Sequence, residues 1–142
     1  MFRKLNDTVF ASPQIGIEDI ALAHAQGIRT IINNRPEDES DDQTPGPEIE
    51  VAAHEAGLAY IAIPITHAGF SEAQVKAMVE ALESSPGPVL AYCRSGTRSA
   101  LLWALAEARR GGNPQKIAAQ AAEAGYDISP VRPLVDMFAA GV

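Results

Sequence analysis

Short apolar segments alternate with helix-forming segments along most of this chain, and this alternation limits the folds open to it. The apolar segments that suit buried strands are Val9–Ala11, Ile28–Asn33, Leu58–Ile63 and Val89–Tyr92. The segments with helical character are 18–26, 48–56, 71–83 and 98–110. Strands that alternate with helices predict the α/β class. We expect three layers, with a mostly parallel central sheet of about four or five strands and helices on both faces.

The ends of these helices carry recognisable signals. Gly27 and Gly57 each follow a helical segment, and glycine accepts the left-handed backbone that often ends a last turn. The stretch 71–74 (Ser-Glu-Ala-Gln) is a capping box that opens another helix. Asn113 and Ser129 each precede a proline, which is typical of a cap residue before a first-turn proline. Two further helices are therefore predicted near the end of the chain.

Size and charge narrow the function classes. A chain of 142 residues fits one domain over 1–142. The net charge of −7 disfavours nucleic acid or an anionic membrane as a partner. No apolar window approaches the roughly 18 to 20 residues of a membrane span, and the N-terminal residues lack the apolar core of a secretory signal. One cysteine cannot form an internal disulfide, so we expect a cytoplasmic protein.

The only cysteine, Cys93, lies where a predicted strand ends and a short polar loop leads into a helix. The helix N-terminus and the flanking Arg94 and Arg98 favour thiolate over thiol and hold an anion beside it. Gly96 relieves crowding, so that successive backbone N–H groups can turn inward around an anion. Arg98 can bind two oxygens with its guanidinium fork, and Ser99 can donate a hydrogen bond to the sulfur.

Two interpretations of this cysteine are open: an inert buried thiol, which is common for cysteine, and a nucleophile that attacks or carries an oxyanionic substrate. The glycine, the two arginines and the strand–loop–helix context favour the nucleophile. The predicted catalytic residues are Cys93, Arg98 and Ser99. The predicted substrate-binding residues are Arg94, Ser95, Gly96, Thr97, Asn34, Arg35 and His67.

Ligands of parallel sheets bind beyond the carboxyl ends of the strands, and Asn34 and Arg35 follow a predicted strand at that edge. Asn34 can also be a simple turn residue. Arg35 can bind a substrate anion, or pair with Glu37 or Asp38. The acidic run 37–42 is predicted to be a solvated loop, with a lid as the alternative.

The loop at 93–99 resembles the active-site loops of cysteine phosphatases and rhodaneses. Segments 12–14, 27–35 and 60–64 resemble dual-specificity phosphatases in order and spacing. The chain most resembles the bacterial beta-lactamase-hydrolase-like, phosphatase-like domain family, which also occurs fused to metallo-β-lactamase-fold persulfide dioxygenases. This resemblance covers roughly Val9 to Gly111 and implies the cysteine-phosphatase fold. It also places three residues beside the active site: Gln14, Asn34 and Arg35.

Three features depart from the tyrosine-phosphatase pattern. Four residues separate Cys93 from Arg98, where that class has five. Tyr92 precedes the cysteine, where histidine is usual. The loop 66–69 lacks the aspartate general acid of the class, and His67 is its only titratable side chain. Either His67 is a simple exposed loop residue, or it donates the proton that a phosphatase needs.

The four-residue spacing matches the rhodanese pattern Cys-Arg-x-Gly-x-Arg, so we expect a sulfurtransferase. Cys93 would take sulfane sulfur from thiosulfate or a low-molecular-weight persulfide and pass it to cyanide or an external thiol such as glutathione. A persulfide dioxygenase is a candidate partner. The alternative is a phosphatase that hydrolyses phosphate monoesters through a Cys93 phosphocysteine. A non-catalytic anion-binding module is the third hypothesis. No metal-ligand spacing is present, and we expect no cofactor.

Overall fold

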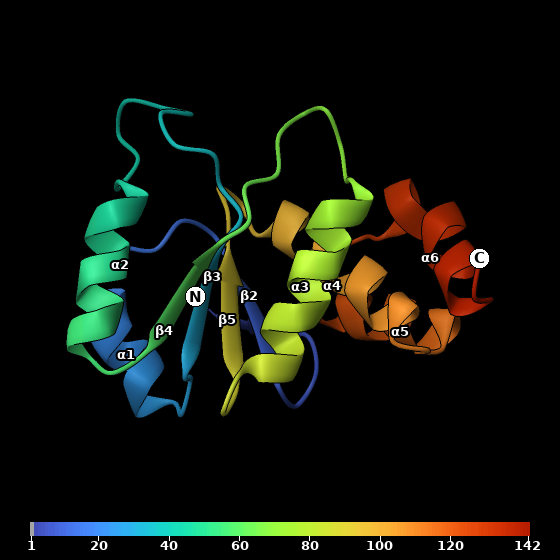
Figure 1. Cartoon of the computed structure of the whole chain (residues 1–142), viewed down its shortest axis with the longest axis horizontal. Helices are drawn as coiled ribbons and strands as arrows, with labels where there is room; N and C mark the ends of the chain where they lie inside the picture. The colour runs from blue at the N-terminus through green and yellow to red at the C-terminus, as the bar shows by residue number, and fades with distance from the viewer. Residues whose placement is uncertain (1) are drawn as a thin grey trace.

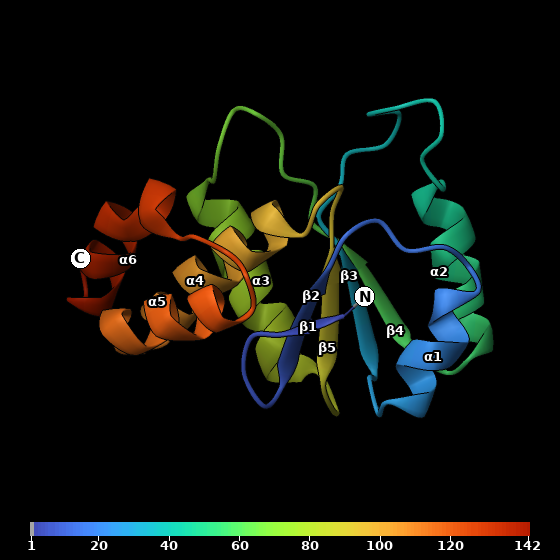
Figure 2. The same ribbon diagram turned by 180° about the vertical axis from the view of Figure 1, so that it is seen from behind.

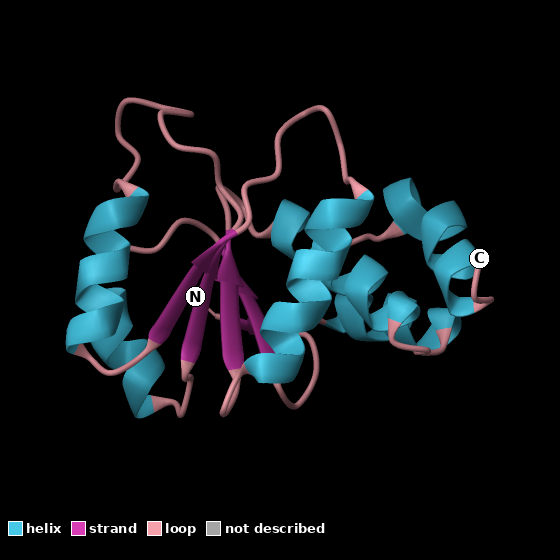
Figure 3. Cartoon of the chain, viewed as in Figure 1, coloured by secondary structure: helices cyan, strands magenta, loops and turns pink. Residues whose placement is uncertain are grey.

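The central sheet has the strand order β1-β2-β5-β3-β4 in the computed structural model, which describes residues 2–142 (Figures 1 and 3). The strands are β1 (Arg3–Lys4), β2 (Val9–Ser12), β3 (Thr30–Asn33), β4 (Ala59–Ala62) and β5 (Val89–Tyr92). Strands β2 to β5 pair in parallel, and β1 pairs antiparallel with β2. The predicted mostly parallel α/β sheet is confirmed. The two-residue edge strand β1 is not foreseen by the sequence, because both of its residues are charged and exposed.

Helices cover both faces of the sheet (Figures 1 and 2). One face carries α1 (Asp19–Ala25) and α2 (Gly46–Glu55). The other carries α3 (Glu72–Ser84), α4 (Thr97–Arg109), α5 (Pro114–Glu123) and α6 (Arg132–Ala139). Asn113 caps α5 as predicted, since its side chain accepts from the Lys116 N–H. Ser129 does not cap an α-helix: it begins a short 3₁₀ helix, η1 (Ser129–Val131), and α6 starts after it.

The strands place alternate side chains in two separate cores, one on each face. On β3, Ile31 packs on the side of α1 and α2, whereas Ile32 packs on the side of α3 to α6. Helix α4 is buried along most of its length between the sheet and the outer helices. Trp103, the single tryptophan, and the leucines of α4 lie in the core on that face of the sheet, and the tryptophan is fully buried there.

The carboxyl ends of the four parallel strands lie at one edge, where Figure 3 shows several loops converging. The register pairs Tyr92 with both Ser12 and Asn33, and Asn33 with Ala62. The residues that follow each strand are therefore brought together although they are far apart in sequence. Within residues 2–142 no helix has both the length and the apolar character that crossing a membrane requires.

Candidate active site

Cys93 lies at this edge, fully buried, in the loop between β5 and α4. Its Sγ accepts a hydrogen bond from the Gly96 N–H at 3.1 Å. Gly96 has φ of +93°, the left-handed region that favours glycine, and this conformation turns its N–H back toward the sulfur. The loop is also held from outside, because the Gln14 N–H donates to the Arg94 carbonyl at 3.2 Å. The helix N-terminus and an inward N–H thus favour negative charge at the sulfur.

The other loop residues fall into two groups. Arg94, Ser95 and Thr97 are exposed on the outside of the loop, where the Ser95 and Thr97 hydroxyls bond to each other at 3.0 Å. Arg98 is only partly exposed and extends across the edge of the sheet toward the loops after β3 and β4. The loop therefore presents Arg94 to solvent and keeps Arg98 at the site.

The guanidinium of Arg98 has five N–H groups, and the protein pairs three of them. Nη1 donates to Glu39 Oε2 and to the Ile65 carbonyl, each at 2.8 Å, and Nη2 donates to Glu39 Oε1 at 2.8 Å. This pairing leaves the Nε–H and the second Nη2–H, which share one edge of the planar group, for an oxyanion. The hydrogen bond with Glu39 raises the pKa of Arg98, and the nearby Cys93 adds to that shift.

Glu39 is a site residue that the sequence does not reveal. The prediction that the acidic run is solvated is wrong for Glu39, whose side chain is 18% exposed and lies between two arginines. Its hydrogen bond with Arg98 is the largest cause that lowers its pKa, from 4.5 to about 2, and Arg35 contributes further. The only local signal is the spacing of four residues from Arg35. Nothing in the sequence connects Glu39 with Arg98, 59 residues away.

Arg35 is 4% exposed and anchors the loop that carries Glu39. Its Nε donates to Glu39 Oε1 at 2.8 Å, and its Nη atoms donate to Gln14 Oε1 and Ser40 Oγ, each at 3.0 Å. The carboxylate partner is thus Glu39, neither Glu37 nor Asp38. Arg35 is separated from Arg98 by one shared carboxylate, which places it beside the site, as the family resemblance implies.

Ser99 and Asn34 are brought together in a buried link below the loop. The Ser99 hydroxyl donates to Asn34 Oδ1 at 2.8 Å, so the predicted bond from Ser99 to the sulfur is wrong; the side chain faces the end of β3 instead. The Asn34 side chain in turn donates to the Ile63 carbonyl at 2.9 Å. This chain of bonds ties the start of α4 to the ends of β3 and β4.

His67 is exposed on the loop after β4. That loop begins at the edge of the site, because the Ile65 carbonyl two residues earlier accepts from Arg98. Its fold is local, with the Ala68 N–H donating to Thr66 Oγ1 at 3.1 Å. The role of His67 as a proton donor stays a prediction.

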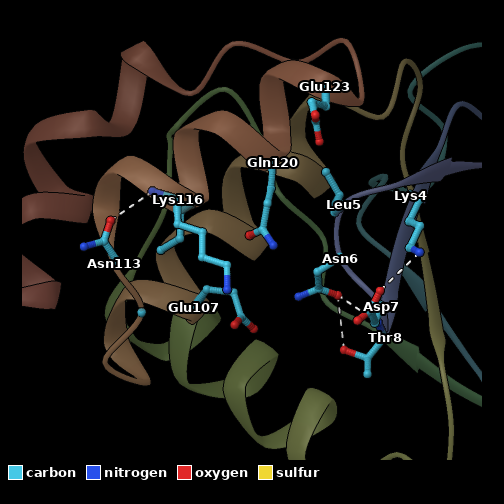
Figure 4. A pocket seen from close by; sticks show the side chains of 12 residues that line it. Lys4, Leu5, Asn6, Asp7, Thr8, Glu107, Asn113, Lys116, Gln120 and Glu123 are labelled. Atoms are coloured by element: carbon cyan, nitrogen blue, oxygen red, sulfur yellow. Dashed lines mark hydrogen bonds and ion pairs between the residues drawn. The ribbon is translucent and has the colours of Figure 1, made fainter.

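A cleft of about 700 Å³ lies elsewhere, between the turn after β1 and helix α5 (Figure 4). Its polar side chains bond mainly among themselves: Asn6 with Thr8, Lys4 with Asp7, and Asn113 with the backbone of Lys116. None of the Cys93 loop lines it. The cleft is therefore separate from the candidate site at the sheet edge.

The fold and the buried cysteine at this edge define a phosphatase-like domain. A family model described as "Beta-lactamase hydrolase-like protein, phosphatase-like domain" matches residues 1–110, and the chain belongs to this family. A beta-lactamase hydrolase-like protein of Xylella fastidiosa (strain Temecula1 / ATCC 700964) is 35% identical over 103 residues, which are 72% of this chain and 24% of that protein. The corresponding protein of Agrobacterium fabrum is 34% identical over 108 residues, 76% of this chain and 25% of that protein. The chain spans about a quarter of the length of these relatives.

Several solved structures share the fold. A proposed phosphatase from Neisseria meningitidis superimposes with a TM-score of 0.83 at 31% identity, covering 96% of each chain. P. aeruginosa TpbA has a TM-score of 0.66 at 16% identity, covering 99% of this chain and 84% of its own. PTPMT1 has a TM-score of 0.72 at 14% identity, covering 99% and 98%. The last two likenesses show the fold alone.

These findings overturn the sulfurtransferase prediction. The family is phosphatase-like, and the Neisseria meningitidis structure at 31% identity is described as a proposed phosphatase, so these findings support an enzyme domain of the phosphatase-like class. The prediction rested on the count of four residues between Cys93 and Arg98. That count gives the length of the loop, but it does not identify the scaffold that surrounds it.

Proposed function

We propose that this domain hydrolyses phosphate monoesters through a phosphocysteine formed on Cys93. The observation that carries the proposal is the Gly96 N–H bonded to the Cys93 sulfur at the start of α4, beside an arginine that Glu39 holds in place. Inward N–H groups and a two-donor guanidinium edge stabilise the charge that develops on the oxygens of a phosphoryl group. Membership of a phosphatase-like family supports the same chemistry.

The reaction consists of two displacements at phosphorus. The Cys93 sulfur bonds to phosphorus while the ester P–O bond breaks, and the leaving oxygen takes up a proton. Water then attacks the phosphocysteine, the P–S bond breaks, and inorganic phosphate and the thiolate are released. Neither step needs an oxidant or a reductant, and Arg98 stays bound to the phosphoryl oxygens through both.

The proton donor sets the preferred substrate class. A positioned general acid typically contributes 10² to 10⁴ in rate, and the loop 66–69 offers His67 or solvent for this role. A phenol, with a pKa of about 10, leaves with less help from a proton than an alkyl alcohol does. Aryl phosphates are therefore the preferred substrates of this proposal, and phosphotyrosine belongs to that class.

Turnover of p-nitrophenyl phosphate tests the proposal directly. Wild-type protein should release phosphate and be inhibited by vanadate, and a quenched reaction should show a mass gain of one phosphoryl group. Cys93→Ser should abolish both signals. Arg98→Lys, which keeps the charge but loses the fork, should lower kcat/KM about 100-fold or more. Turnover that survives in Cys93→Ser, or a wild-type protein inert toward every aryl phosphate tried, would overturn it.

A further inference from the structure

Tyr126 lies against the Cys93 loop, although it comes from the segment after α5 and outside residues 1–110 that the family model matches. The tyrosine is 7% exposed, and its hydroxyl donates to the Ser95 carbonyl at 3.5 Å. A Cβ at position 96 would overlap the Tyr126 hydroxyl and lie 3.0 Å from Tyr126 Cζ. The phenol therefore occupies the space that any side chain at position 96 would need.

The structure holds Tyr126 firmly in this position. The chain leaves α5 through Gly125, with φ of +92°, and the Tyr126 N–H then donates to the Ala121 carbonyl at 2.9 Å. The Arg3 guanidinium lies over the tyrosine ring, 5.3 Å from its centroid, and donates to the Ala124 carbonyl at 3.2 Å. The ring is thus clamped between the N-terminal strand and the loop that it touches.

The Ser95 carbonyl and the Gly96 N–H belong to one peptide unit. That unit is planar and trans, so its carbonyl and its N–H point in opposite directions. On one side the carbonyl accepts from Tyr126, and on the other the N–H donates to Cys93 Sγ at 3.1 Å. Because glycine rotates freely, nothing within residue 96 itself would keep its N–H on the sulfur.

We propose that Tyr126 is a positioning residue of the catalytic loop. Its hydroxyl holds the carbonyl side of the 95–96 peptide, and the N–H of the same peptide is thereby kept on the Cys93 sulfur. Bonds in such a chain also polarise one another, which strengthens the bond to the thiolate. Burial raises the pKa of Tyr126 by more than the nearby Arg3 charge lowers it, and Cys93 raises it further, so the phenol keeps the proton that it donates. The catalytic consequence rests on the proposed phosphatase function.

Tyr126→Phe removes the hydroxyl and keeps the ring. We expect kcat/KM for p-nitrophenyl phosphate to fall about fivefold, the effect of one hydrogen bond. The pH at which half of Cys93 is thiolate should rise above its wild-type value, because the thiolate loses part of its hydrogen bonding. The ultraviolet absorbance of the thiolate measures this pH, with Cys93→Ser as the blank, because the chain has one cysteine. The matched control is Tyr60→Phe, which removes a hydroxyl that accepts from the Asn33 side chain. This variant should leave the thiolate titration unchanged.

The thiolate titration needs no turnover, so it separates this proposal from the proposed function. A thiolate titration identical in wild type and Tyr126→Phe, at equal melting temperature, would overturn the positioning role even if the protein is an active phosphatase. The Gly96→Ala substitution gives a second test when it is made in the wild-type protein and in the Tyr126→Phe variant. It should cost more thiolate stabilisation in the wild type, since only there does the new Cβ overlap the phenol oxygen. Equal costs in the two proteins would also overturn the role.

Discussion

At the scale of single residues, the protein holds Arg98 by part of its guanidinium, and in the proposed function the remaining donors bind the substrate. Glu39 and the Ile65 carbonyl occupy three of its donors and leave the edge that suits an oxyanion. A free arginine side chain would have to be ordered at the moment of binding, at a cost in conformational entropy. Because Glu39 already holds the guanidinium in the folded protein, this entropy is lost on folding and not on substrate binding.

Glu39→Gln should therefore lower kcat/KM and make the stability of the domain depend less on pH in acid. We expect kcat/KM to fall about tenfold, because a neutral amide holds the guanidinium less well than a carboxylate. The folded pKa of Glu39 is about 2 against an ordinary 4.5. Its contribution to stability is thus fully present above pH 4.5 and is lost as the pH falls toward about 2. Urea midpoints measured at about pH 7 and about pH 3, on either side of this onset, test this.

The control for Glu39 is Asp41→Asn, an exposed carboxylate in the same loop. It should change neither kcat/KM nor the dependence of the urea midpoint on pH. The Glu39→Gln variant should be less stable than the wild type at about pH 7 and should lose less stability in acid than the wild type does. If the difference in urea midpoint between the two proteins were the same at about pH 3 as at about pH 7, the ion pair with Arg98 would not be the source of the acid sensitivity.

His67 is tested by comparing two leaving groups. His67→Ala should lower the turnover of an alkyl phosphate much more than that of p-nitrophenyl phosphate, since the poorer leaving group needs the proton more. Initial rates on the two substrates give the ratio, and His54→Ala, on an exposed position of α2, is the matched control. An unchanged ratio would assign the proton to solvent.

At the scale of elements, the site depends on how α4 is fixed to the sheet. The link from Ser99 through Asn34 to Ile63 joins the first turn of α4 to the ends of β3 and β4. It is wholly buried at Ser99 and Asn34, so each polar atom in it must find its partner inside the protein. The link sets where α4 begins, and hence where its N-terminus lies relative to Cys93.

Ser99→Ala should lower the free energy of unfolding by about 1 to 3 kcal/mol, because the Asn34 Oδ1 loses its buried donor. Urea denaturation followed by the fluorescence of Trp103, the only tryptophan, measures the change. Ser84→Ala, at the exposed end of α3, should be nearly neutral in the same experiment. Equal effects of the two substitutions would contradict a special role for this link.

At the scale of the whole molecule, the C-terminal helices pack against the helix that follows the Cys93 loop. Helices α5 and α6 pack on α4, and one buried core runs from the sheet through α4 to α6. Phe138 on α6 belongs to that core, and the Arg109 guanidinium lies 3.9 Å from its ring centroid. The segment beyond the family match therefore packs into the same core as the helix that follows the Cys93 loop, and we expect the two to unfold together.

Phe138→Ala should destabilise the whole domain by about 3 kcal/mol through lost burial and a cavity. A single urea transition should persist, shifted to a lower midpoint, when turnover and Trp103 fluorescence are followed together. Met137→Ala, on the exposed face of the same helix, should shift the midpoint little. Loss of turnover at a urea concentration where the Trp103 fluorescence is still native would show instead that α6 unfolds before the rest of the domain.

The local features of this protein are determined by the sequence itself. The alternation of strands and helices, the glycine in the cysteine loop and the cap at Asn113 are signals of period or spacing within a few residues, so they can be recognised in the chain alone. The class of fold and the hypothesis of a nucleophilic cysteine follow from them. The choice between sulfur and phosphate does not, because residue counting in the loop favours the wrong chemistry.

Only the tertiary structure decides which side chains complete the site. Glu39 meets Arg98 across 59 residues, and Tyr126 meets Ser95 across 31. Such pairs depend on how parallel strands bring separate loops to one edge and how α5 ends against them, and packing of that kind leaves no periodic trace in the chain. The sequence by itself determines the candidate nucleophile, Cys93, and the sheet that carries it, whereas tertiary packing determines which side chains hold Arg98 and the cysteine loop in place.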